Sequence, residues 1–139
     1  PDGQSLAVAA NRDGEPMLFT IPIEGGSPLP LVQEYSTNPI WAPSGEFLLY
    51  FGADVGTNVP VKAVSKDGVA RPLPNLTLTR GDRLAFLQTD DALIVLKGNV
   101  SQKEFYRVDL DTGHRTTVRE LAPPGVEVLS PEPGETLTL

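Results

Sequence analysis

The feature that most constrains the fold is an internal repeat with a period of 42 to 45 residues. Four anchor positions each stand three residues before a leucine in an apolar run, at spacings of 42, 45 and 44 residues: Gly3, Gly45, Asp90 and Gly134. A second glycine follows each of the first three anchors at a constant offset of 23 residues: Gly26, Gly68 and Gly113. Two independent marks that keep a constant phase indicate a repeat protein.

An aromatic residue also recurs in phase with the anchors. Trp41 lies four residues before Gly45, and Phe86 lies four residues before Asp90. The segments "WAPSGEFLLYF" and "FLQTDDALIVL" align without a gap. We therefore expect Trp41 and Phe86 to be equivalent packing residues at a hinge between two strands.

The segment before each second glycine has the alternation of a half-buried strand. Its mainly apolar face carries Phe19, Ile21 and Ile23, then Val61, Ala63 and Ser65, then Tyr106, Val108 and Leu110. The opposite face carries Thr20, Lys62 and Arg107. The run after each anchor ("LAVAA", "LLYF", "LIVL") is apolar on both faces, which predicts a strand covered on both sides by stacked sheets.

Two further strands complete each repeat. We expect one before the anchor (39–41, 84–86, 126–129) and one after the second glycine (29–32, 71–76, 116–121). Asp-Gly, Gly-Gly and Thr-Gly pairs supply the positive φ that tight turns between antiparallel strands require. Four short antiparallel strands per repeat of this length are the unit of a β-propeller blade.

The predicted fold class is therefore all-β, a β-propeller of four-stranded antiparallel blades forming an incomplete ring of about three blades. The expected boundaries are a partial blade at 1–37, blades at 38–80 and 81–123, and the start of another blade at 124–139. Propellers contain 4–8 blades. Hence the chain is expected to be part of a larger protein or, less favoured, to complete a ring by association of copies.

Composition excludes several classes of function. A net charge of −7, with 11 Lys and Arg against 18 Asp and Glu, offers no cationic surface for nucleic acid. No stretch approaches the ~20 apolar residues of a membrane span. The chain has no cysteine, so disulfides, thiolate nucleophiles and cysteine-based metal sites are excluded.

The repeat resembles the TolB-like propeller repeat, a bacterial relative of the WD repeat. The resemblance rests on "PDG" at 1–3, "RDG" at 12–14, "GG" at 25–26 and "WAPSG" at 41–45. The third copy departs from the pattern with "TDD" at 89–91, and the last has an extra residue in "SPEPG" at 130–134. The matched residues form turns and blade contacts, so the resemblance is specific for the fold and almost silent on activity.

The resemblance implies a non-catalytic scaffold that presents loops at its rim to a protein partner or small ligand. Such propellers stand behind a kinase or winged-helix region in bacterial multidomain proteins, or alone in the periplasm, so an extracytoplasmic location is favoured. The alternative is the gating propeller of a prolyl-oligopeptidase-like serine peptidase whose catalytic domain is separate. We also expect self-association through exposed blade faces, and no contact with nucleic acid or membrane.

Polar residues of the kinds used in catalysis or metal binding have simpler interpretations here. His114, the only histidine, follows a turn glycine and is expected to be exposed to solvent. Two acidic segments faintly resemble calcium loops, Asp109-x-Asp111-x-Gly113 and Asn11-x-Asp13-x-Glu15, but each lacks the remaining oxygen ligands. Both are more typical of hairpin turns.

Two remaining patterns also fall short of a site. Neighbouring carboxylates in an extended chain, such as Asp90 and Asp91, point to opposite faces and do not form an acid–base pair. Two segments fit the glycosylation pattern, Asn75-Leu76-Thr77 and Asn99-Val100-Ser101. We give this pattern little weight because the repeat is of a bacterial type. We therefore assign no catalytic residue, cofactor or metal site, expect no enzyme activity within this chain, and leave the ligand-binding residues unassigned.

Overall fold

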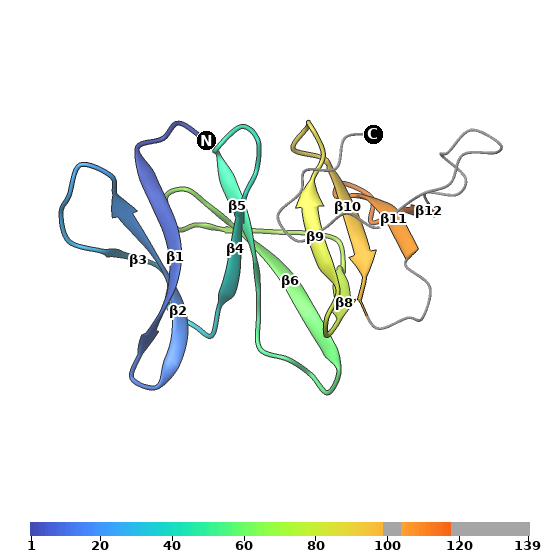
Figure 1. Ribbon diagram of the computed structural model, residues 1–139, viewed down its shortest axis with the longest axis horizontal. Coiled ribbons are helices and arrows are strands. Elements are labelled where there is room, and N and C mark those ends of the chain that lie inside the picture. The colour runs from blue at the N-terminus through green and yellow to red at the C-terminus, as the bar shows by residue number, and fades with distance from the viewer. Residues whose placement is uncertain (99–103, 118–139) are drawn as a thin grey trace.

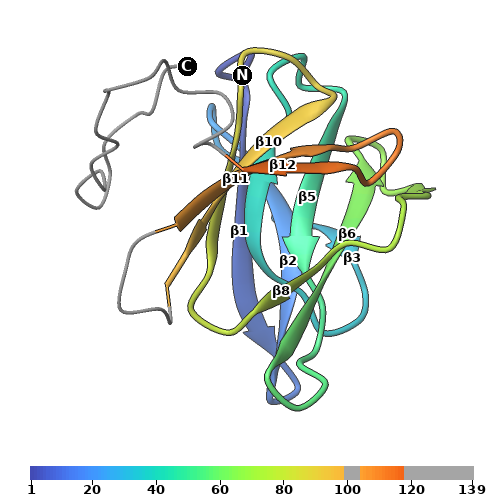
Figure 2. The ribbon, with the colours of Figure 1, turned by 90° about the vertical axis from the view of Figure 1, so that its right-hand side faces the viewer.

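The computed structural model describes residues 1–98 and 104–117. These residues form twelve β-strands arranged in three antiparallel sheets that stand side by side (Figure 1). Across the described residues no helix is present, and hence none that could span a membrane. A view turned by 90° shows the sheets behind one another (Figure 2). The all-β class predicted from the repeat is confirmed.

The sheets follow the order of the sequence. The first contains β1 (Ser5–Arg12), β2 (Glu15–Pro22) and β3 (Leu29–Val32). The second contains β4 (Thr37–Trp41), β5 (Phe47–Phe51), β6 (Asn58–Ser65), β7 (Ala70–Arg71) and β8 (Thr77–Thr79). The third contains β9 (Arg83–Phe86), β10 (Ala92–Lys97), β11 (Glu104–Asp109) and β12 (Arg115–Thr117).

The outer strand of the second sheet differs from the prediction. A strand was expected over 71–76, but β7 ends at Arg71 and pairing resumes only at Thr77 in β8. Pro72 and Pro74 interrupt the segment because proline has no N–H to donate to the ladder. Both β7 and β8 pair with β6, so the outer strand is split rather than lost.

The other outer and inner strands lie close to their expected positions. β3 has the predicted bounds, while β4 and β9 begin before the expected residues and end at them. Of the strand expected at 116–121, β12 covers 116–117 and begins one residue earlier. The remainder, 118–121, lies outside the described residues, as do the strand expected at 126–129 and the blade start at 124–139.

The hinge between the first two strands is equivalent in the second and third sheets. Trp41 pairs with Leu48, and Phe86 pairs with Leu93. Each leucine lies three residues after its anchor and is fully buried. Trp41 packs against the cluster between the first two sheets, whereas Phe86 packs against the cluster between the last two. The prediction that both aromatics are packing residues is confirmed.

Two hydrophobic clusters join the three sheets. The first and second sheets meet through Leu18, Leu31, Val32, Leu48, Tyr50 and Val64. The second and third meet in a larger cluster that includes Phe47, Leu49, Val61, Ala63, Leu93, Val95, Tyr106 and Val108. β5 therefore contributes alternate residues to both clusters, which confirms that the doubly apolar strand is covered on both sides.

The apolar face of the third strand points in different directions in different repeats. In the second sheet, Val61 and Ala63 pair with β5 residues that face the third sheet. In the third sheet, Val108 pairs with Leu93, which faces back towards the second. The turn after β6 is closed by Ser65 and Val69, whereas the turn after β11 is one residue longer. A shift of one residue exchanges the two faces of a strand.

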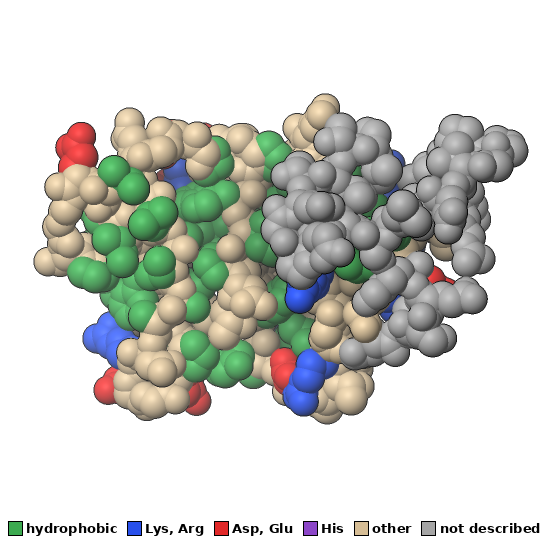
Figure 3. Space-filling model, in the orientation of Figure 1, with side chains coloured by type: hydrophobic (Ala, Val, Ile, Leu, Met, Phe, Trp, Pro, Cys, Tyr) green, Lys and Arg blue, Asp and Glu red, His purple; other side chains and the backbone are tan. Residues whose placement is uncertain are grey.

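The first sheet has an uncovered apolar face. Leu6 and Ile23 are 52 % and 56 % exposed, while Leu18 on the opposite face is fully buried. Phe19 and Ile21 are half-buried and belong to the same outer face as Leu6. Apolar side chains are visible over this sheet in the space-filling view (Figure 3). The face predicted to be buried in the first repeat is thus the outer one, because the described residues place no sheet beside it.

Candidate functional site

A cleft of about 430 Å³ opens where the second and third sheets meet, at the end where β4 and β9 begin. Its apolar lining comes from Phe51, Val59 and Leu78. Its polar lining comes from the start of β4, the β5–β6 loop and the β8–β9 turn: Thr37, Asn38, Asp54, Thr79, Arg80, Asp82 and Arg83. A concave site with an apolar floor and a few polar groups at its rim is the usual form of a ligand pocket.

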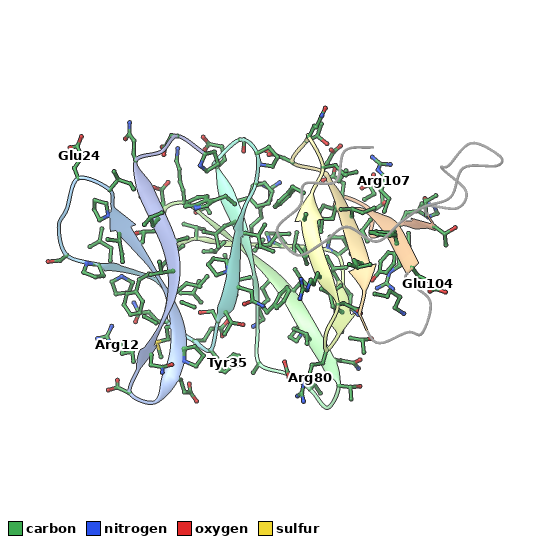
Figure 4. All side chains as sticks on the ribbon, viewed as in Figure 1. Arg12, Glu24, Tyr35, Arg80, Glu104 and Arg107 are labelled. Carbon is green, nitrogen blue, oxygen red and sulfur yellow. The ribbon has the colours of Figure 1, made fainter. Side chains whose placement is uncertain are left out.

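An ion pair crosses the rim of the cleft. The Arg80 guanidinium donates two hydrogen bonds to Asp54 Oδ2, from Nε at 2.9 Å and from Nη2 at 2.6 Å. Nη2 also donates to the Gly56 carbonyl at 3.4 Å. Arg80 lies at the end of the molecule where β8 meets β9 (Figure 4). The pair joins the β5–β6 loop to the β8–β9 turn across the rim.

Asp82 is buried and has a structural role. Its Oδ2 accepts the Thr79 N–H at 3.0 Å, and its Oδ1 accepts the Gly98 N–H at 3.1 Å. The carboxylate therefore holds the β8–β9 turn against the end of β10. Gly98 is required at this place because a Cβ would collide with the Gly81 carbonyl. Both oxygens of Asp82 thus accept a backbone N–H, and the carboxylate shapes this side of the cleft.

Asn38 lines the cleft with an unusual backbone conformation. Its φ is 52°, one of two positive values among the described residues other than glycine. The β4–β5 register shifts between Thr37 and Ile40, so Asn38 occupies a β-bulge. Asparagine tolerates the left-handed region better than most residues, yet the conformation still costs free energy. Such strain is concentrated at functional sites.

Arg83 is the cation of the cleft that is available to a ligand. It is exposed at the start of β9. Within residues 1–98 and 104–117, no hydrogen bond or ion pair engages its side chain. The cleft thus combines a guanidinium, the amide of Asn38 and the hydroxyls of Thr37 and Thr79. These groups suit a polar ligand that carries hydrogen-bond acceptors.

The structure places the predicted candidate residues away from this cleft. His114 is exposed, and its N–H donates to Thr112 Oγ1 at 3.2 Å, as expected of a turn residue. Asp109 Oδ1 accepts the N–H groups of Thr112 at 3.0 Å and Asp111 at 2.8 Å. These backbone bonds, from Thr112 first, hold the pKa of Asp109 below its ordinary value. The acidic segment is therefore a turn.

The second acidic segment is also a turn. Asp13 and Gly14 connect β1 and β2 with φ values of 54° and 88°, the positive pair that a two-residue hairpin loop of this kind requires. Asn11 pairs with Pro16, and Glu15 pairs with Arg12. Its three oxygen-bearing residues are thus spread along two strands and their turn.

The remaining sequence candidates do not converge either. Asp90 accepts a hydrogen bond from Ser44, whereas Asp91 Oδ1 accepts one from Thr89 Oγ1 at 2.5 Å, so the two carboxylates have separate partners. Asn75 is exposed between β7 and β8, and Asn99 lies outside the described residues.

Sequence reasoning missed the cleft because its residues come from three separate segments. One local signal was available: Arg80-Gly81-Asp82-Arg83 places three charges and a glycine in the connection between two blades. A weaker signal for an unusual backbone conformation was Asn38. Asparagine tolerates positive φ, and this one immediately precedes a proline in a strand.

Comparisons with known proteins identify the architecture. A protein from Agrobacterium tumefaciens, provisionally named TolB, matches with a TM-score of 0.61 and 18% identity over 85% of this chain and 46% of its own. The crystal structure of a nidogen/laminin complex matches with a TM-score of 0.56 and 11% identity over 84% of this chain and 44% of its own. The fold is an incomplete β-propeller.

The three sheets are therefore propeller blades, and the cleft lies between the second and third of them. This chain spans less than half the length of the two solved structures it matches. No protein-family profile and no curated protein sequence matches it. At these levels of identity the likeness concerns the fold alone.

Proposed function

We propose that this chain is a non-catalytic propeller module that binds a protein partner or small ligand at its loop rim, as part of a larger bacterial protein. The observation that carries the proposal is the convergence of Arg83, strained Asn38 and the Asp54–Arg80 pair on one cleft. Connecting loops positioned by a rigid scaffold are common binding sites. These features support a binding site at the loops between the second and third blades.

The chemistry of the cleft favours binding over catalysis. Its two carboxylates are engaged, Asp54 by Arg80 and Asp82 by two backbone N–H groups. A general base needs an available lone pair within reach of substrate. The other polar groups of the cleft include the Arg83 guanidinium, the Asn38 amide and the hydroxyls of Thr37 and Thr79, with an apolar floor beneath them. These features support a site that recognises polar acceptors on a partner.

A thermal-shift screen of polar metabolites and short peptides tests the proposal. Ligands of the cleft should stabilise the chain and lose this effect in Arg83→Ala, since no hydrogen bond or ion pair to another described residue engages that guanidinium. Arg12→Ala is the matched control because it removes the same charge from an exposed strand end on the first blade. Stabilisation that Arg83→Ala leaves unchanged would place binding elsewhere.

The alternative of a peptidase gating propeller stays a prediction. This alternative predicts that the parent gene encodes a Gly-x-Ser-x-Gly elbow with a downstream aspartate and histidine. A kinase or winged-helix region in that gene would favour the sensor module instead. Sequencing the complete reading frame distinguishes the two.

A further inference from the structure

Two equivalent residues of adjacent blades meet at the cleft. Asn38 and Arg83 each lie three residues before the hinge aromatic of their blade, Trp41 and Phe86. Each stands near the start of an inner strand, Asn38 in β4 and Arg83 in β9, and both residues are exposed. Both line the cleft between the second and third blades. The repeat thus presents the same position twice, once as an amide and once as a guanidinium.

The charged groups of the cleft differ in how they are paired. The Arg80 guanidinium lies 2.6 Å from Asp54 Oδ2, so these two charges balance each other. Asp82 is buried, and backbone N–H groups rather than Arg83 bond its two oxygens. No hydrogen bond or ion pair to another described residue engages the Arg83 guanidinium. A ligand group with one negative charge is therefore complementary to Arg83.

The floor of the cleft is apolar and belongs to the core between the blades. Val59 and Leu78 are 8 % and 2 % exposed, and both are members of the larger hydrophobic cluster. Phe51 is half-buried and packs against that cluster. A floor that is part of a close-packed core holds its shape. It favours an apolar ligand group, because contact with the floor removes that group from water.

We propose that the cleft binds a small carboxylate with an apolar body. The carboxylate pairs with the Arg83 guanidinium, whose planar donors match two carboxylate oxygens, and the apolar body contacts Val59 and Leu78. The Asn38 amide supplies a further donor at the rim. This inference rests on the proposed function, because it concerns the same cleft, and it adds the chemical class of the ligand.

Two probes of the same shape test the role of charge, namely hydrocinnamate and its neutral amide, hydrocinnamamide. Each is titrated into isotopically labelled protein, and the amide NMR shifts give both the affinity and the location of binding. The shifts should be centred on the cleft, at residues such as Thr79 and Arg83. Hydrocinnamate should bind about tenfold more tightly than the amide, since charge-assisted hydrogen bonds are the stronger ones.

Substitution of Arg83 separates recognition of charge from a structural effect. Arg83→Gln keeps hydrogen-bonding groups but removes the charge, so the two probes should then bind equally well. Arg12→Gln is the matched control, because Arg12 is an exposed strand end on the first blade, and it should leave the tenfold preference unchanged. A purely structural effect of Arg83→Gln would weaken both probes alike and keep the preference, which would overturn the proposal.

The outcomes also distinguish this inference from the proposed function. Equal binding of the two probes at the cleft of the native chain would overturn carboxylate recognition but leave a ligand-binding cleft standing. Absence of shifts at the cleft with both probes would overturn both proposals.

A third probe identifies the source of the carboxylate. N-acetylphenylalanine carries the same ring and carboxylate as hydrocinnamate with a peptide group added, and it should also bind more tightly than hydrocinnamamide. Tighter binding of N-acetylphenylalanine than of hydrocinnamate would identify a peptide C-terminus as the source. The reverse order would identify a free organic acid.

Discussion

The backbone N–H of Ser44 donates a hydrogen bond of 2.9 Å to Asp90 Oδ1, joining the hinge turns of two adjacent blades. Asp90 occupies the anchor place that glycine holds in the preceding repeats. A departure from the repeat pattern therefore has a structural explanation, because the carboxylate satisfies an N–H that the neighbouring turn leaves open. Asp90 therefore makes a blade contact, whereas Asp91 bonds Thr89 within its own turn.

This contact predicts a pH-dependent stability. Hydrogen bonding from the Ser44 side chain, and then from its backbone, holds the pKa of Asp90 below the ordinary 3.8. A lowered folded-state pKa stabilises the fold above 3.8 and loses that contribution as the pH falls through the folded value. Asp90→Asn should be less stable than the native chain in urea at pH 7. The difference should shrink as the pH falls below 3.8 and Asp90 becomes protonated, and a difference independent of pH would contradict the assignment.

Equivalent leucines should differ in their contribution to stability. Leu93 is fully buried between two blades, whereas Leu6, three residues after its own anchor, is 52 % exposed. Leu93→Ala should lower the free energy of unfolding by about 2–5 kcal/mol, since it leaves a cavity. Leu6→Ala should cost less than about 1 kcal/mol because little surface is buried there. Urea denaturation measures both, and equal losses would argue against an uncovered first blade.

Tyr50 should ionise late and weaken the fold in alkali. Burial, followed by the negative charge and hydrogen bond of Glu34, raises its pKa from 10.0 to about 12. Because the folded-state value is the higher one, the stabilising contribution is complete below pH 10 and is lost as the pH rises towards 12. Burial also raises the pKa of Tyr106, so phenolate absorbance should show a late phase whose amplitude falls, without disappearing, in Tyr50→Phe. Glu34→Gln should lower the pKa of Tyr50.

Asn38 should tolerate glycine and reject alanine. At a φ of 52°, a residue with a Cβ and no local hydrogen bonding pays about 1–2 kcal/mol. Asn38→Ala should therefore lower the melting temperature, while Asn38→Gly should leave it nearly unchanged. Calorimetry of the two variants measures the effect, and the opposite order would place Asn38 in an ordinary strand conformation.

We expect the uncovered face of the first blade to drive self-association. Leu6 and Ile23 are more than half exposed on one apolar face. Light scattering should show an average mass that rises with protein concentration, since exposed apolar patches promote association. The double variant Leu6→Asn with Ile23→Asn should suppress this rise. Val55→Asn with Val69→Asn, at exposed turn positions, is the control and should not.

Much of the fold could be predicted from local features of the sequence. Strand alternation and turn glycines act over a few residues. They therefore predicted the four strands of each repeat and the equivalent hinges at Trp41 and Phe86. The prediction of one strand at 71–76 was wrong because two prolines there lack the N–H that a strand ladder needs. The prolines were a local signal, but the prediction followed the constant glycine spacing instead. No functional residue of the cleft was predicted.

The sequence by itself determined the repeat, the strand count and the apolar faces, because each depends on periodicity within a short segment. Tertiary structure alone decided which way each face points. The turn after β11 is one residue longer than the turn after β6, so positions counted from the turn glycine point to opposite faces in the second and third blades. The cleft likewise depends on which segments lie beside one another. Pairing between distant segments sets these relationships, and such pairing has no signature within either segment.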